Sequence, residues 1–380
     1  MLYFDTAATT KVSEEVITDI VYALRNDWAN PSSISEQGME VKRKVERARK
    51  QIADYINAEP EEIIFTASGS EANNLAIKGF LKANPKYKTI LTTEIEHPSV
   101  YNTCVDLKKD GYGVDFVPVD AWGHIGKYDF VDFLSRDMVH FVSIMMANNE
   151  IGTIQNIQGF AHATHKFNGV IHTDATQAFG KIPIDVKDLG VDLMSVGLHK
   201  IGLPRGVAFL YKRKGIAISP IIHGGHQEMD YRAGTENVAY IVAAGNQVER
   251  LSKKEYPSDT MINYLFDKIY DDIRRKHEYY YNGCSVLMQM LPNILSLTFT
   301  SVDAETLITL LDMKGIQVSA GAACCAGEKT PSRVLKAIGL SDEDAFSTIR
   351  ISISEDTTKE DCDKFVKILG ECLDSLKMIN

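Results

Sequence analysis

Lys200 is the residue whose position most strongly suggests covalent chemistry. It follows the apolar run VDLM and the residues SVGLH, and it precedes a Gly/Pro turn and a second apolar run, GVAFLYK. A lysine at a strand end can form a Schiff base, because desolvation there lowers its pKa and frees the nitrogen lone pair. Most lysines after a strand are ordinary surface residues, so this interpretation needs support from other residues.

Asp174 gives part of that support, because it ends the apolar run GVIHTD. A carboxylate on a strand can keep a pyridine nitrogen protonated, which makes the ring an electron sink. Gln177 lies three residues later and can donate to the phenolic oxygen of such a ring. Helix capping or a solvated amide is the alternative role for Gln177.

The segment FTASGSEANNLAIKG indicates a strand, a tight turn and an amphipathic helix. Free N–H groups and the positive dipole at such a helix start can hold a phosphate. Gly69 would allow close approach, and Ser70 would add a hydroxyl. An ordinary helix cap is the alternative, since Ser and Gly are common there.

Three more polar residues follow or occupy apolar runs. His97, in TTEIEHPSV, can stack on a pyridine ring or move protons, or it is a structural histidine. Asn149, in MMANNEIG, can reach a ring oxygen; Asn148 competes for that role, and either can simply form a turn. Arg350, in FSTIRISIS, can grip a carboxylate with two hydrogen bonds, unless it forms a surface ion pair.

Two adjacent cysteines lie in the segment VSAGAACCAGEKTPSRVL. Its small residues suit a loop that carries a nucleophilic thiol, and such a thiol needs thiolate character and access. Cys324 and Cys325 could instead be packing residues, a vicinal disulfide or a soft-metal pair. Two cysteines lack the four-ligand spacing of a zinc site, so we predict no metal.

The elements that must position these residues alternate in type. Short apolar runs predict buried strands: EEIIFTAS, KTILTTEI, GVDFVPV, VHFVSIMMA, GVIHTDA and VDLMSV. Helical patterns lie between them, at Gly38 to Asn57, Glu71 to Leu81 and Ile157 to Phe167, which indicates an α/β fold around a mostly parallel sheet. After about Leu251 the pattern indicates a smaller α+β layer. We predict a large domain of residues 15–250 and a small domain of residues 1–14 and 251–380, with the site at the carboxyl ends of the strands near their junction.

The bulk composition narrows the class of partner. The chain has 380 residues, 44% hydrophobic and 24% charged, which is ordinary for a globular protein. A formal charge of −10 gives no basic surface for nucleic acid or an anionic membrane, so we expect neither as a direct partner. The N-terminus does not resemble a signal peptide, and six sparse cysteines fit a reducing compartment, so we expect a cytoplasmic protein.

These segments together resemble the NifS/IscS-type cysteine desulfurases, in the class V aminotransferase group of fold-type I pyridoxal-phosphate enzymes. The match runs nearly end to end and adds the motifs YFDTAATT, NPSS, GLPRGVAFLY, YRAGTENV, LPNILSLTF and PSRVLKAIGL to those quoted above. The resemblance implies a large domain with a mostly parallel seven-stranded sheet between layers of helices, and a smaller α+β domain with the cysteine loop.

The resemblance also implies a residue-by-residue assignment. The pyridoxal 5'-phosphate site would comprise Gly69, Ser70, His97, Asn149, Asp174, Gln177, His199, Lys200 and Thr235. Lys200 would hold the cofactor covalently, Asp174 would pair with the ring nitrogen, and His97 would stack on the ring. Gly69, Ser70 and His199 would hold the phosphate, and Thr235 would reach the phosphate of the other subunit in a homodimer. Arg350 with Asn149 would bind the substrate, and Cys324 would be the nucleophile.

The implied activity is removal of sulfur from L-cysteine, giving L-alanine and an enzyme persulfide. A sulfur-acceptor protein, such as an iron–sulfur scaffold or a tRNA-thiolation protein, would then take the sulfur. The alternatives are a selenocysteine lyase, another class V enzyme, or a catalytically reduced sulfur carrier or assembly partner on this scaffold.

Several positions depart from the family pattern. Gly197 and Leu198 replace the usual Ser-Gly before His-Lys, which removes a hydroxyl expected on the phosphate. Met229 and Asp230 replace an arginine and a glycine, and Glu355 replaces a common arginine. We therefore expect the fold and the cofactor to match those of the family. Any difference from the family should concern the affinity for the cofactor or the identity of the substrate.

Overall fold

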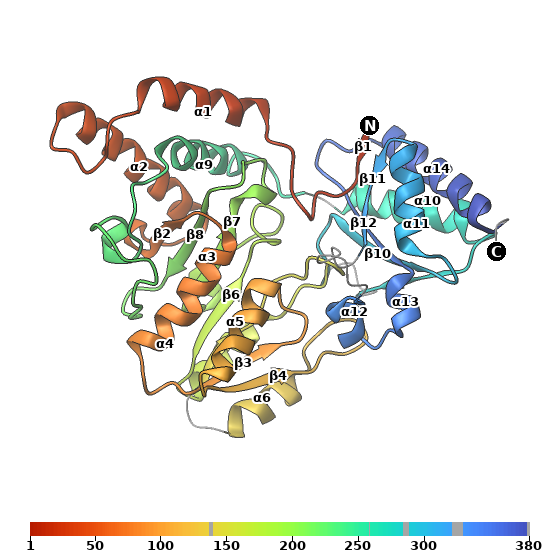
Figure 1. The fold of residues 1–380 in the computed structure, drawn as a ribbon, viewed down its shortest axis with the longest axis horizontal. Helices are drawn as coiled ribbons and strands as arrows, with labels where there is room; N and C mark the ends of the chain where they lie inside the picture. Colours follow the sequence, from red (N-terminus) through yellow and green to blue (C-terminus); the bar gives the residue numbers. More distant parts are fainter. Residues whose placement is uncertain (137–139, 258, 284–288, 321–329, 378–380) are drawn as a thin grey trace.

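A seven-stranded sheet is the centre of the larger part of the molecule (Figure 1). The computed structural model describes residues 1–136, 140–257, 259–283, 289–320 and 330–377. The strand order is β2-β8-β7-β6-β5-β3-β4, and all neighbours are parallel except where β8 pairs with β2 and β7. The strands are β2 (Ile63–Thr66), β3 (Thr89–Thr93), β4 (Gly113–Val117), β5 (His140–Ser143), β6 (Val170–Asp174), β7 (Leu193–Gly197) and β8 (Ala208–Lys212). The predicted mostly parallel seven-stranded sheet is confirmed.

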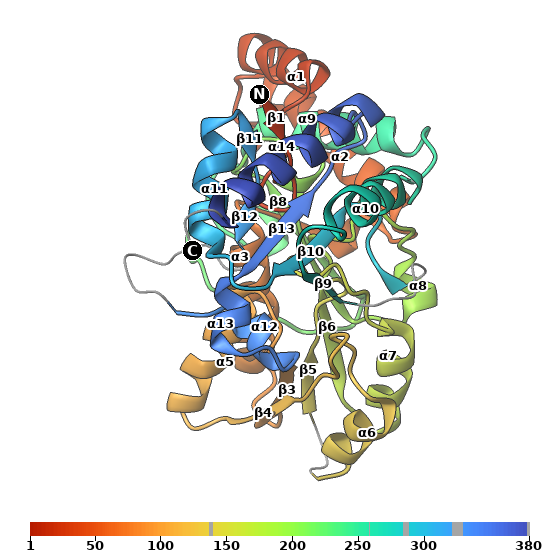
Figure 2. The same ribbon diagram turned by 90° about the vertical axis from the view of Figure 1, so that its right-hand side faces the viewer.

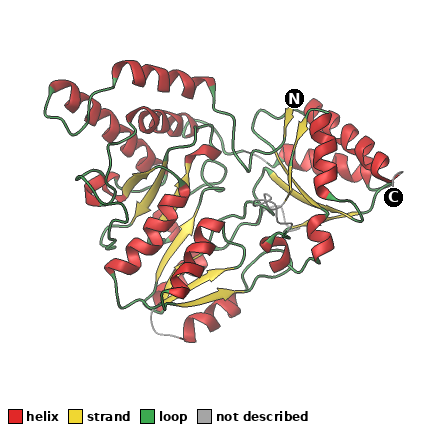
Figure 3. Cartoon of the chain, in the orientation of Figure 1, coloured by secondary structure: helices red, strands yellow, loops and turns green. Residues whose placement is uncertain are grey.

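Helices cover both faces of this sheet (Figure 3). Side chains alternate along each strand: Phe65 packs into one apolar core, and its neighbour Ile64 packs into the other. The first core also receives α1 (Glu14–Asn26), α2 (Glu36–Tyr55), α6 (Lys127–Arg136), α7 (Ile157–Lys166), α8 (Val186–Leu189) and α9 (Val238–Leu251). The second receives α5 (Pro98–Lys109) and the helical segment after Ser68. Burial of every strand on two sides explains the continuous apolar runs in the sequence.

The helical segment after β2 begins two residues earlier than predicted. Its parts are α3 (Gly69–Asn74), a π-helical stretch (Leu75–Gly79) and α4 (Phe80–Ala83). Ser68 is the cap, because its hydroxyl accepts a hydrogen bond from the Glu71 backbone at 3.1 Å. The apolar periodicity starts only after that cap, so the first turn had no hydrophobic signal.

A second, antiparallel sheet forms the smaller part of the molecule, at the right of Figure 1. Its order is β12-β13-β10-β9, formed by β9 (Tyr279–Asn282), β10 (Ile294–Phe299), β12 (Ser319–Ala320) and β13 (Thr348–Ser352). The helices α10 (Thr260–Ile273), α11 (Ala304–Met313) and α14 (Lys359–Lys377) pack against it. The short helices α12 (Arg333–Ala337) and α13 (Asp342–Phe346) instead join an apolar cluster with Ile95, Met145 and Ile151. The predicted α+β layer is confirmed.

The N-terminal segment crosses from the small layer to the large one. β1 (Leu2–Tyr3) pairs with β11 (Ile316–Gln317), and Figure 2 shows β1 beside that strand. Phe4 is buried in the core of the small layer, whereas Ala7 is buried in the core of the large one. The backbone of residues 5–8 therefore lies at the junction. No helix among the described residues is long and apolar enough to cross a bilayer.

Candidate active site

The predicted site residues follow the carboxyl ends of four neighbouring strands. His97 follows β3, Asn149 follows β5, Asp174 ends β6, and Lys200 follows β7 in a short 3-10 turn. These strands are adjacent in the order β7-β6-β5-β3 and run in parallel. Carboxyl ends of parallel strands meet at one edge of a sheet, so the topology gathers these side chains there.

The Lys200 amine lies at the junction of the two layers. It donates to the backbone carbonyls of Ala7 and Ala8, the second at 2.5 Å. Burial and the nearby Arg350 charge together lower its pKa to about 8, against the opposing effect of Asp5 and Asp174. A larger fraction of this amine is therefore neutral near pH 8 than for an ordinary lysine, as a nucleophile requires.

Asp174 is buried and held by two hydrogen bonds. One carboxylate oxygen accepts from the Thr176 backbone at 2.9 Å, and the other accepts from the Asn73 side chain at 2.7 Å. Asp174 also influences the pKa of both His97 and Lys200. The carboxylate, the imidazole and the amine are therefore close enough to influence one another's charge.

Gln177 and Lys181 extend the site beneath the N-terminal segment. The Gln177 side chain donates to the Ala7 carbonyl at 2.9 Å, the same oxygen that Lys200 contacts. Its own carbonyl accepts from the buried Lys181 amine at 3.1 Å. Lys181 thereby fixes which end of the Gln177 amide faces the site. Burial, with the charges of Lys200 and Arg350, lowers the pKa of Lys181 to about 7.

Two glycines face one another where the phosphate was predicted. A Cβ on Gly69 would lie 3.3 Å from the Thr176 hydroxyl and 3.5 Å from Gly197, so a side chain there would fill this space. The Thr176 hydroxyl accepts from the Gly197 backbone at 3.0 Å. His199 lies two residues after Gly197, and burial with the nearby Lys200 charge lowers its pKa to about 4. Thr176 thus supplies a hydroxyl beside the position where the family serine is absent.

The Ser70 hydroxyl lies in the exposed first turn of α3. Leu198, by contrast, is fully buried in the core of the large layer. Leu198 is therefore a packing residue, whereas Gly197 faces the space beside Gly69 and Thr176 where the phosphate was predicted.

Arg350 is buried in β13 rather than on the surface. It donates to the Asp5 carboxylate at 2.7 Å and to the backbone oxygen of Asn149 at 3.0 Å, and its Nε has no partner among the described residues. The surface ion pair considered above is therefore excluded. A guanidinium at the junction, close enough to lower the pKa of Lys200, can hold a small anionic substrate.

The two candidate asparagines have different environments. Asn148 is buried, and its side chain donates to Ile95 at 2.9 Å and accepts from the backbone of Glu150 at 2.8 Å and of Ile151 at 3.0 Å. It forms the turn. Asn149 is partly exposed, which leaves Asn149 as the better candidate for a ligand.

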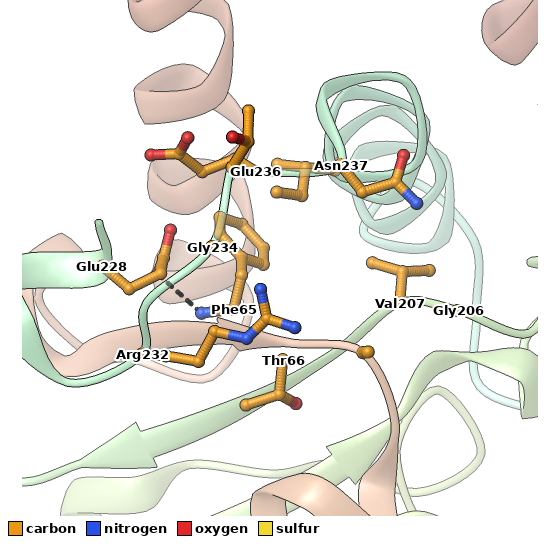
Figure 4. Close-up of a pocket in the computed structure, with 12 residues that line it drawn as sticks. Phe65, Thr66, Gly206, Val207, Glu228, Arg232, Gly234, Glu236 and Asn237 are labelled. Carbon is orange, nitrogen blue, oxygen red and sulfur yellow. Dashed lines mark hydrogen bonds between the residues drawn. The ribbon is translucent and has the colours of Figure 1, made fainter. Parts of the chain in front are cut away.

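Thr235 lines a small cavity of about 140 Å³. Figure 4 shows residues that line this cavity, among them Thr66, Arg232 and Asn237. Arg232 is paired with Glu71 of α3 at 2.8 Å. Thr235 itself is exposed.

Cys324 and Cys325 lie outside the described residues. The chain reaches their segment through Ser319 and Ala320, which pair with Arg350 and Ile349 of β13. It leaves through Ser332, whose hydroxyl donates to the buried Glu150 at 2.5 Å. Both attachment points therefore lie at the junction. Among the described residues, no group of three His, Cys, Asp or Glu side chains could hold a metal.

The described residues fit pyridoxal 5'-phosphate. Lys200, with its lowered pKa, suits the aldehyde of that group, and the buried Asp174 carboxylate suits the ring nitrogen. The space beside Gly69, which one Cβ would fill, suits the phosphate. Sequence reasoning missed Asn73, Lys181 and the Ala7 carbonyl. Only the position of Asn73 one helical turn after the glycine turn gave a signal, since the others depend on tertiary contacts.

The chain is similar to known proteins in both sequence and structure. The family model described as aminotransferase class-V matches residues 2–365. A cysteine desulfurase IscS from Dictyoglomus turgidum is 39% identical over 381 residues, covering 100% of this chain and 96% of that protein. A solved structure described as a NifS-like protein has a TM-score of 0.89 at 34% identity and covers 98% of this chain and 99% of its own. The structure of SspA in complex with cysteine has a TM-score of 0.81 at 32% identity, covering 93% and 99%.

Proposed function

The chain belongs to the aminotransferase class-V family, and from this premise we propose that it is a cysteine desulfurase that uses pyridoxal 5'-phosphate. It is a transferase that takes sulfur from L-cysteine and leaves L-alanine. The observation that carries the proposal is that a lysine of lowered pKa and a buried aspartate lie at the ends of neighbouring strands.

The residues of the chain divide the reaction between them. Bound pyridoxal phosphate supplies an electron sink that stabilises a carbanion at the substrate α-carbon. Asp174 would keep its ring nitrogen protonated, and Arg350 would bind the substrate carboxylate. Lys200 would take the α-proton of the bound substrate and hold it at Nζ. The Cys324 thiolate attacks the substrate sulfur, so that an S–S bond forms as the C–S bond breaks, and the remaining three-carbon unit takes up protons to become alanine.

The first test replaces the amine. Lys200→Ala should abolish the visible absorption of the purified protein and reduce alanine formation from L-cysteine by at least about a thousandfold, because the nucleophile is lost. Lys78→Ala removes a partly exposed lysine paired with Asp106 and should leave both properties unchanged. Continued turnover by Lys200→Ala would exclude the assignment. Parallel assays of alanine formation from selenocysteine and from L-cysteine distinguish a selenocysteine lyase from a cysteine desulfurase.

The second test separates the two thiols. Cys324→Ser should lose the cysteine-dependent persulfide, detected by mass spectrometry of the loop peptide, while the protein keeps its cofactor colour. Cys325→Ser is the matched variant and should retain the persulfide. The reverse result would assign the nucleophile to Cys325.

We also propose that the enzyme works in the cytoplasm as a homodimer and that an acceptor protein receives the sulfur. An iron–sulfur scaffold and a tRNA-thiolation protein are the two candidates. Family membership supports these proposals, and adding each acceptor singly to the persulfide form would identify the one that removes the sulfur.

A further inference from the structure

Asn73 and Ser99 connect two parts of the site. Asn73 is buried in α3, and its amide nitrogen donates to Asp174 at 2.7 Å and to the Ser99 hydroxyl at 2.8 Å. That hydroxyl lies 2.7 Å from Nδ1 of His97. A continuous chain of hydrogen bonds therefore runs from the carboxylate on β6, through α3, to the imidazole at the start of α5.

The direction of this chain follows from its chemistry. The amide nitrogen of Asn73 must face Asp174, since its carbonyl oxygen would be repelled there. The side-chain carbonyl of Asn73 is consequently buried without a hydrogen-bond partner among the residues that the structure describes, an unfavourable arrangement that the two N–H bonds maintain. Because the Ser99 oxygen accepts from Asn73, its own proton is directed to His97.

Nδ1 of His97 receives a second donor from the same residue. The backbone N–H of Ser99 lies 3.2 Å away, so His97 caps the N-terminus of α5 with this nitrogen. Two donors on Nδ1 leave it unprotonated and place the ring proton on Nε2.

The charges around His97 also disfavour its cationic form. Burial lowers its pKa, and the neighbouring Lys200 and Arg333 lower it further, against the opposing effect of Asp174. His199 is a further neighbour and is itself largely neutral above pH 4. The positive end of the α5 dipole acts in the same direction as the two cations.

We propose that Asn73 and Ser99 are positioning residues that hold His97 as its neutral, Nε2-protonated tautomer and link that state to the ionised form of Asp174. The inference rests on the proposed function for its purpose: the imidazole presents a hydrogen-bond donor to the cofactor face without adding a positive charge beside Lys200. It does not rest on that function for its test, because the tautomer exists in the protein without cofactor.

The experiment observes the imidazole directly. Protein labelled with ¹⁵N-histidine, with and without pyridoxal phosphate, is measured by long-range ¹H–¹⁵N correlation, and His97→Gln assigns the signals. In the native protein, His97 should be the Nε2–H tautomer at all pH values around neutrality. Ser99→Ala should raise the His97 pKa by about half to one pH unit and populate the Nδ1–H tautomer, because Nδ1 loses one donor.

Matched variants separate this role from general packing. Ser99→Thr keeps the hydroxyl and should preserve the native signals. Thr103→Val removes another hydroxyl of α5, which bonds to Asn74 and the Ser99 carbonyl, and should also preserve them. Asn73→Ser should move the pKa in the same direction as Ser99→Ala. A folded Ser99→Ala protein with native tautomer and pKa would overturn the proposal, whether or not Lys200→Ala retains turnover.

Discussion

Lys200 lies beside a guanidinium and two backbone carbonyls, and this environment sets its protonation. Burial and Arg350 lower its pKa to about 8, so the neutral amine accumulates as the pH rises through that value instead of through 10.5. The rate at which the apoprotein binds pyridoxal phosphate should therefore rise with a midpoint near pH 8. Absorbance after rapid mixing over a pH series measures this midpoint.

Removal of the neighbouring charge should move that midpoint upward. Arg350→Gln deletes the positive charge and leaves the Asp5 carboxylate without its partner, and both changes favour protonated Lys200. We expect a shift of about one pH unit. Arg43→Gln breaks an exposed pair with Glu40 on α2 and should leave the midpoint in place. An unshifted midpoint in Arg350→Gln would show that Arg350 does not act on Lys200.

At the scale of elements, the turn Glu228–Asp230 is strained and held by one buried ion pair. All three residues have left-handed φ angles of 47°, 56° and 68°. Glycine adopts this region freely, and the family pattern has glycine where this chain has Asp230. The Glu228 carboxylate binds the Arg49 guanidinium at 2.8 and 2.9 Å and accepts from the Phe65 backbone at 2.7 Å. The turn is thereby fastened to α2 and β2.

Breaking this ion pair should be costly. Glu228→Gln leaves Arg49 charged and buried, and we expect a loss of about 3–5 kcal/mol in the free energy of unfolding. Denaturant unfolding followed by circular dichroism measures the loss. Glu40→Gln, in an exposed pair with Arg43, should cost at most about 1 kcal/mol. Equal costs for the two variants would show that the buried pair does not hold the turn.

Elements with a local sequence pattern could be predicted, whereas contacts between distant residues could not. The strand ending at Asp174 was evident, because a strand buried on both faces must be apolar along its length. The start of α3 was misplaced by two residues, because Ser68 marks it with a cap and not with apolar spacing. Pairings between distant residues, such as Lys200 with the Ala7 carbonyl, have no local pattern at all.

At the scale of the whole molecule, the site lies where the two layers meet. Arg350 comes from the small sheet, Lys200 from the large one, and the Asp5 to Ala8 backbone passes between them. The division into residues 15–250 and residues 1–14 with 251–380 stays a prediction. The burial of Phe4 in one core and Ala7 in the other agrees with a crossing of the N-terminal segment near that boundary.

Thr235 is exposed beside its cavity, and in the proposed homodimer it would serve the cofactor of the other subunit. This arrangement predicts complementation between two inactive variants. Thr235→Asp places a negative charge near the phosphate, and Lys200→Ala lacks the nucleophile, so each homodimer should lose activity. A mixed dimer has one intact site, because the Lys200→Ala subunit lends its native Thr235 to the subunit that retains Lys200.

Random reassociation of the two variants should therefore restore about a quarter of native desulfurase activity, since about half of the dimers are mixed and each has one working site. Native mass spectrometry counts the mixed dimers, and alanine formation per mixed dimer measures the restored site. Exposed Thr18→Asp on α1 serves as the charge control and should remain active by itself. If Thr235 served its own subunit, both sites of the mixed dimer would be defective, and no activity would return.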